Sequence, residues 1–130
     1  MAVWLQNQGF THWKDVYKRQ EYAASRGEFL NGKIMAAYLD YEFIDAAAVI
    51  RFDKNGNFDS EKTDRLLSKR LGKCANAVIP GFYGAMEDGT VKTFSRGGSD
   101  VTGSLVAKAV QADVYENWTD VSGFLVTRCV

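Results

Sequence analysis

Apolar residues recur at helical spacing in three stretches of the chain, and each stretch predicts a helix. In residues 26–39, apolar side chains return every three or four positions, which is the pattern of an amphipathic helix. Residues 60–71 repeat the pattern, with leucines on one side and basic residues near the end, where they interact favourably with the helix dipole. A third helix is predicted over residues 99–111.

Short apolar runs bounded by turn residues predict the strands. The end of the segment 43–52 is predicted to form a strand, and residues 77–79 have the composition of a strand buried on both faces. Further strands are predicted over residues 90–94, after the turn 87–89, and over residues 114–118. Strands and helices that alternate with short connections predict an α/β fold. We expect a mostly parallel sheet with helices on both faces and right-handed crossovers.

Composition places the chain among ordinary globular domains. Its 130 residues suffice for one domain with a core, and 46% apolar against 25% charged residues excludes a disordered class. Sixteen basic and sixteen acidic residues cancel, so nothing in the net charge favours nucleic acid or an anionic membrane as a partner. No secretory signal or membrane span is visible, which predicts a reducing cytoplasm. Cys74 and Cys129 are therefore expected to be free, and with His12 they are too few for a zinc site.

The run Arg96-Gly97-Gly98-Ser99-Asp100 is the clearest candidate for chemistry. Two glycines let the backbone approach a ligand, and a helix that begins here directs its free N–H groups at an anion. The arginine adds a planar donor that binds a carboxylate or phosphate through two hydrogen bonds. The structural alternative is a tight connection in which Ser99 caps the helix and Asp100 only interacts with its dipole.

Four segments stand in the order in which aspartate kinases carry their motifs. They are residues 25–28 (Ser-Arg-Gly-Glu), 77–84, 96–100 and 118–123. On these segments the chain resembles the aspartate kinases of the amino acid kinase family from about Glu21 to Val126. The resemblance implies that fold and an ATP-dependent transfer of a phosphoryl group to the side-chain carboxylate of L-aspartate, giving 4-phospho-L-aspartate.

The resemblance also implies roles for individual residues. Glu28 would bind the ammonium group of the substrate, Arg96 a substrate carboxylate, and Ser99 would add a hydrogen bond. Asp100 would be the catalytic aspartate that organises the transfer network, since the attacking carboxylate is already ionised at neutral pH and needs no base. Without the motif, Glu28 would be read as an acidic residue in the first turn of a helix. Arg26 is read as a surface charge and is not assigned to the site.

The remaining assignments concern backbone donors and the nucleotide. Gly97 and Gly98 would offer their N–H groups to the substrate, and Thr119 and Asp120 would contact ATP at the carboxyl edge of the sheet. The alternative for the last two is a plain turn that ends a strand. Trp118 is predicted to be a core residue rather than a platform for adenine.

The family further implies ATP with Mg²⁺ as cofactors, the biosynthesis of lysine, threonine and methionine, and a homo-oligomer for the full-length enzyme. Two alternatives stay open. One is a related kinase that acts on glutamate or acetylglutamate, and the other is a folded, non-catalytic remnant.

Parts of the family pattern are missing from this sequence. No Lys-Phe-Gly-Gly motif is present to neutralise the transferred phosphate, and residues 127–130 depart from the Asp-Pro-Arg that follows in the family. Residues 1–20 do not resemble the family and are interpreted as a foreign or truncated leader. We therefore expect residues 21–126 to be a partial catalytic domain that is inactive alone.

Overall fold

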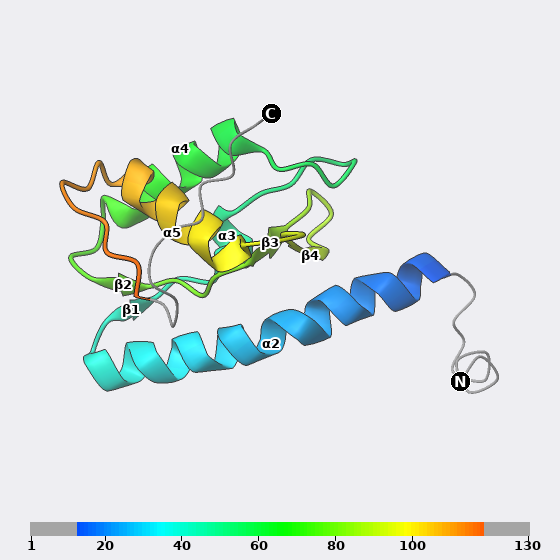
Figure 1. Ribbon diagram of the computed structural model, residues 1–130, viewed down its shortest axis with the longest axis horizontal. Helices are drawn as coiled ribbons and strands as arrows, with labels where there is room; N and C mark the ends of the chain where they lie inside the picture. Colours follow the sequence, from blue (N-terminus) through cyan, green and yellow to red (C-terminus); the bar gives the residue numbers. More distant parts are fainter. Residues whose placement is uncertain (1–12, 119–130) are drawn as a thin grey trace, which may run out of the picture.

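The computed structural model describes residues 13–118. Its elements follow in the order α2 (Trp13–Leu39), β1 (Glu42–Phe43), α3 (Ala46–Val49), α4 (Ser60–Leu71), β2 (Ala77–Val78), β3 (Tyr83–Ala85), β4 (Val91–Thr93) and α5 (Gly98–Ala109). Figure 1 shows the strands between two layers, with α2 on one side and α3, α4 and α5 on the other. The predicted α/β fold with helices on both faces is confirmed.

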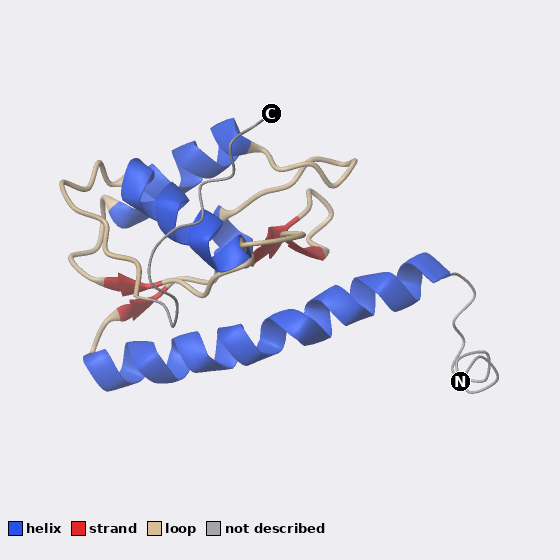
Figure 2. Cartoon of the chain, viewed as in Figure 1, coloured by secondary structure: helices blue, strands red, loops and turns tan. Residues whose placement is uncertain are grey.

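The strands form two separate pairs, one parallel and one antiparallel (Figure 2). β1 and β2 run parallel, with Glu42 opposite Ala77, whereas β3 and β4 form an antiparallel hairpin. A single parallel bridge between Arg51 and Ala85 connects the segment after α3 to β3. The parallel component of the predicted sheet is thus present, and the hairpin adds an antiparallel component.

Helix α2 is longer than the pattern predicted, because it begins at Trp13 rather than near Arg26 and crosses position 20 without interruption. Its buried positions are Glu21, Ser25, Gly32 and Ala36, which follow each other at helical spacing but are small or polar. A hydrophobic period therefore does not reveal the first half of the helix. An ion pair of 2.8 Å between Glu21 Oε1 and Lys92 Nζ fixes that half against β4.

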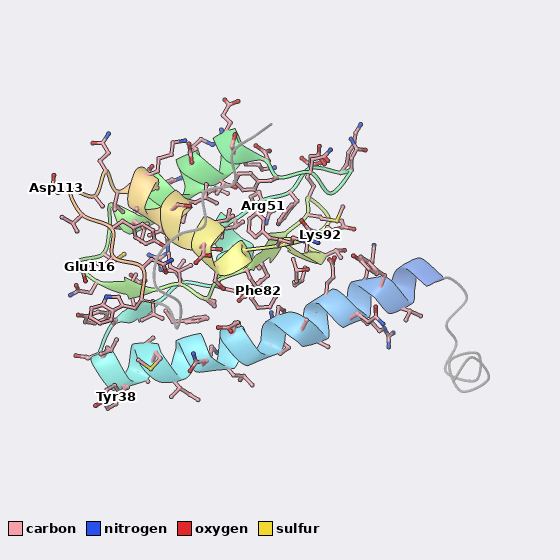
Figure 3. The ribbon with its side chains drawn as sticks, viewed as in Figure 1. Tyr38, Arg51, Phe82, Lys92, Asp113 and Glu116 are labelled. Carbon is pink, nitrogen blue, oxygen red and sulfur yellow. The ribbon has the colours of Figure 1, made fainter. Side chains whose placement is uncertain are left out.

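The large apolar residues of α2 lie mostly on its uncovered side. Leu30, Ile34 and Tyr38 are 57%, 66% and 82% exposed, although their spacing predicted a buried face. In Figure 3 the side chain of Tyr38 points away from the rest of the molecule. The helix packs through its small residues, which bring its backbone close to β1 and to Pro80.

The core lies between the strands and the short helices. Its fully buried members include Ile50, Leu67 and Tyr83. Helix α4 was predicted over residues 60–71 and is confirmed there. Asp59 caps it, since Asp59 Oδ1 accepts the N–H of Lys62 at 2.9 Å.

Several predicted strands are shorter than expected or absent. The strand predicted at the end of residues 43–52 is reduced to isolated bridges at Arg51 and Phe52, which follow the short helix α3. Residues 77–79 form a strand of two half-buried residues. The prediction of a strand over residues 114–118 is wrong, because this segment is irregular and pairs with no described strand. Trp118 is 89% exposed, so its assignment to the core is also wrong. Its indole N–H donates to Glu116 instead.

Candidate substrate site at the amino end of helix α5

The glycine-rich run forms a left-handed turn that starts α5. Gly97 has φ +57° and occupies the position before the helix, which begins at Gly98 and includes Ser99 in its first turn. The structural alternative, in which Ser99 caps the helix, is therefore wrong in this respect, and no side chain caps α5. The first N–H groups of α5 have no such partner, and Gly97 reaches this geometry without the steric cost that a Cβ would add.

Gly98 has no room for a side chain. A Cβ there would lie 2.7 Å from Cβ of Phe82 and 2.9 Å from Cβ of Phe94, closer than such atoms approach each other. Figure 3 shows Phe82 beside the amino end of α5. The run of two glycines thus has two separate causes, a left-handed backbone at Gly97 and close packing at Gly98.

A cleft of about 540 Å³ opens beside this turn. Both Glu28 of α2 and Ser99 of α5 line it, although they are far apart in the sequence. Glu28 lies in the middle of a 27-residue helix. The alternative reading of Glu28 as a first-turn residue is therefore wrong, because no helix begins near it.

Arg96 and Asp100, the charged residues of the run, are both exposed and do not line the cleft themselves, whereas Ser99, which lies between them in the chain, does. Arg96 is exposed and makes no hydrogen bond or ion pair to another residue of the described part of the chain, so its guanidinium is free to meet a ligand. Asp100 lies in the first turn of α5 and accepts a 3.2 Å hydrogen bond from Asn117 Nδ2. An acidic residue here also satisfies the helix dipole, so geometry alone leaves both roles of Asp100 open.

The predicted nucleotide contacts Thr119 and Asp120 lie outside the described residues. The segment just before them does reach the cleft, where Tyr115 and Glu116 form part of the wall. The sequence analysis missed both residues because it read this segment as a strand. Asn117 was missed for the same reason.

The sequence analysis interpreted Arg26 as a surface charge, but in the structure its side chain is half-buried and packs against aromatic rings. Its guanidinium lies 4.4 Å from the ring centroids of both Tyr22 and Phe29, and 5.6 Å from that of Tyr83. Its Nε and Nη2 donate to Ser25 Oγ at 3.1 and 2.9 Å. Tyr22 and Phe29 belong to α2 itself, so the contact with Tyr83 is the one that connects Arg26 to β3, two residues before Glu28 in the helix.

Within residues 13–118, no three histidine, cysteine or acidic side chains gather as a metal site would require. The loop after Asp53 is an Asx turn, in which Asp53 Oδ1 accepts the N–H groups of Asn55 and Asn57. Cys74 is free, as predicted, while Cys129 lies outside the described residues. None of the described helices is long and apolar enough to cross a membrane.

Comparisons with known proteins agree on one family. The family model "Amino acid kinase family" matches residues 6–128. Aspartokinase 3 of Bacillus subtilis (strain 168) is 41% identical over 103 residues, which cover 73% of this chain and 23% of the relative. The chain thus spans about a quarter of the length of the curated relatives it matches.

Solved structures give the same result. The crystal structure of Clostridium acetobutylicum aspartate kinase matches with a TM-score of 0.75 and 64% identity, over 81% of this chain and 24% of that one. Escherichia coli aspartokinase III, solved with aspartate and ADP in its R-state, matches with a TM-score of 0.71 and 26% identity, over 82% and 26% of the two chains.

Proposed function

Because the chain belongs to the amino acid kinase family, we propose that it provides the aspartate-binding part of an ATP-dependent aspartate kinase. The relatives at 41% and 64% identity are aspartate kinases, which supports this choice within the family. The observation that carries the proposal is the cleft that Glu28 and Ser99 share, next to the turn that bears Arg96. L-Aspartate presents one ammonium and two carboxylate groups, and Glu28 and Arg96 carry the complementary charges.

Each group then has a part in the reaction. Glu28 attracts the substrate ammonium, while Arg96 and the free N–H groups of Gly98 and Ser99 bind a carboxylate. The other carboxylate is ionised and attacks the γ-phosphorus of ATP, so that a new P–O bond forms as the bond to ADP breaks. Asp100 organises the groups around this transfer, held in place by Asn117. Catalysis by such a site consists mainly of positioning and charge neutralisation.

ATP is the proposed phosphoryl donor, with Mg²⁺ as its counterion. In nucleotide sites Mg²⁺ usually keeps several waters and binds phosphate oxygens together with one or two carboxylates. Thr119 and Asp120 remain our prediction for the nucleotide contact. A homo-oligomer, a cytoplasmic location and a role in lysine, threonine and methionine biosynthesis remain predictions of the same kind.

Binding tests the proposal directly. A chain that spans about a quarter of its relatives' length is expected to transfer no phosphoryl group alone. We therefore expect L-aspartate, titrated into the ¹⁵N-labelled chain, to shift the amide signals of Glu28 and of residues 96–100. L-Glutamate is the control for length, and N-acetyl-L-glutamate is the control for a free ammonium group.

The outcomes separate the candidate functions. Saturable shifts with L-aspartate that are at least about tenfold weaker with both controls support an aspartate site. Stronger shifts with L-glutamate or its acetyl derivative indicate the related kinases. Shifts with none of the three contradict an aspartate site in this chain and favour a non-catalytic remnant.

A further inference from the structure

We propose that Thr102 is a positioning residue of the aspartate site, because its hydroxyl fastens the loop before β3 to the first turn of α5. The inference rests on the proposed function, since it concerns the same turn. Thr102 is among the residues that line the cleft, and its hydroxyl is engaged in hydrogen bonds with Phe82 and Gly98. It acts through Phe82 and Gly98, on either side of that hydroxyl.

The Thr102 hydroxyl makes two hydrogen bonds of opposite sense. It donates to the carbonyl oxygen of Gly98 at 2.7 Å and accepts the N–H of Phe82 at 3.1 Å. A threonine hydroxyl has one donor hydrogen and two acceptor positions, so both bonds form together. Thr102 is 3% exposed, and water therefore does not compete for either bond.

Phe82 needs this partner because its backbone is strained. Its φ is +63°, a left-handed conformation that an aromatic residue rarely adopts. Its two backbone groups are both held, the N–H by Thr102 and the carbonyl oxygen by the N–H of Phe94 at 2.9 Å. Strain of this kind persists where the surroundings fix it, and it occurs most often at functional sites.

We call the two hydrogen bonds of the Thr102 hydroxyl, to Phe82 and Gly98, the clamp. The clamp affects the proposed substrate-binding groups through packing. Gly98 lies so close to Phe82 that a Cβ at Gly98 would be 2.8 Å from the Cα of Phe82. On the other side, a Cβ at Gly81 would be 3.1 Å from Ser99 Oγ. The loop thus touches the first turn of α5 at two successive residues. A shift of Phe82 would move Gly98 and Ser99 relative to Glu28.

A simpler explanation of the same hydroxyl is the bond to the preceding turn that many helical Ser and Thr residues make. Ser104 provides that case in the same helix, since its Oγ donates to the carbonyl oxygens of Asp100 and Val101 at 2.9 Å. Ser104 is exposed, and within residues 13–118 its side chain makes no hydrogen bond outside α5. Thr102 differs because its hydroxyl also accepts a hydrogen bond from another segment.

The variants Thr102→Val, Thr102→Ser and Ser104→Ala of the full 130-residue chain separate the two explanations. Valine keeps the shape of threonine without the hydroxyl, whereas serine keeps the hydroxyl. We expect Thr102→Val to weaken L-aspartate binding by about tenfold or more in the NMR titration, at a temperature where circular dichroism shows it folded. Thr102→Ser is expected to remain within about threefold of the parent chain, and Ser104→Ala to bind like the parent.

Equal affinities of the parent chain and folded Thr102→Val would overturn the proposal. A loss in Thr102→Val that Thr102→Ser does not restore would also overturn it, because the hydroxyl would then not be the cause. If the parent chain itself binds no aspartate, the proposed function fails instead, and the two failures are thus distinct.

One measurement needs no variant and decides the matter if Thr102→Val does not fold. If substrate binds only the clamped turn, saturating L-aspartate will slow hydrogen exchange of the Phe82 amide by about fivefold or more in the parent chain. Exchange at the amide of Asn55, far from the turn in the sequence and in another loop, is the internal control and is expected to stay unchanged. Equal slowing at both amides, or none at Phe82, contradicts the clamp.

Discussion

The phenol of Tyr83 donates a 2.8 Å hydrogen bond to Oδ1 of Asp45, the carboxylate oxygen that also accepts the N–H of Ala47 and so caps α3. Tyr83 is fully buried, and the guanidinium of Arg26 lies 5.6 Å from the centroid of its ring. One residue of β3 thus connects α2 to α3. Its phenol must stay protonated to do so, because a phenolate cannot donate to a carboxylate.

This bond predicts a loss of stability in alkali. Burial first, and then the hydrogen bond to Asp45, raise the pKa of Tyr83 far above its ordinary value. A raised pKa favours the protonated form in the folded state, so its contribution is complete below the unfolded value of about 10 and declines as the pH rises above it. We expect the unfolding free energy from urea titrations to fall more steeply above about pH 10 in the parent chain than in Tyr83→Phe. Parallel curves would contradict this.

Arg26 is expected to stabilise the docking of α2. Arg26→Met removes the charge and both bonds to Ser25, and we expect it to lower the free energy of unfolding by about 1–2 kcal/mol. Arg26→Lys keeps the charge without the planar fork and should fall between. Arg65→Met on α4 is the control, because Arg65 is exposed and makes no bond to another described residue. The idea fails if the Arg26 and Arg65 variants melt alike.

Arg96 is expected to act on affinity alone. A charge-assisted bond to a carboxylate contributes about 1.5–3 kcal/mol, so Arg96→Ala should weaken L-aspartate binding by roughly ten- to hundredfold. Because Arg96 is exposed and has no partner among the described residues, the melting temperature should not change. Calorimetric titration measures the first quantity and thermal unfolding the second. Unchanged affinity would remove Arg96 from the site.

Asp100 is the residue for which the two readings differ most. If it only interacts with the dipole of α5, Asp100→Asn should cost about 0.3–1 kcal/mol of stability and leave turnover nearly intact. If it organises phosphoryl transfer, turnover should fall by about a hundredfold or more with little change in stability, since an amide oxygen can still accept from Asn117. Turnover is measured in a chimera in which residues 21–118 replace the matched segment of Clostridium acetobutylicum aspartate kinase. Asp113→Asn, an exposed change beyond α5, is the control.

Capping residues and hydrophobic periods in the sequence predicted the elements whose bounds are set by neighbouring residues. Helix α4 was found with its bounds because a capping aspartate precedes it and leucines mark its buried side. The first half of α2 was missed because Glu21 and Ser25 are its buried residues, and neither contributes to a hydrophobic period. Their burial depends on partners distant in the sequence, such as Lys92, which no local pattern shows.

The turn at the start of α5 was predicted for similar reasons, and its role as a substrate site stays a prediction. Glycines at a strand-to-helix junction suggested the turn at residues 96–100, and the structure gives both of them a steric cause. The hydroxyl of Thr102 and the strained backbone of Phe82 were missed, because each appears ordinary in its own segment. Only their proximity gives them a role.

The two strand pairs also differ in when they can form. The β3–β4 hairpin pairs residues that are close in the chain. β1 and β2 are separated in the sequence by α3 and α4, so their pairing closes a much longer loop. Closing the longer loop costs more entropy before any contact repays it. Folding should therefore begin at the hairpin and end with the parallel pair. Changes in the hairpin would slow folding, and changes at Phe43 or Val78 would mainly speed unfolding.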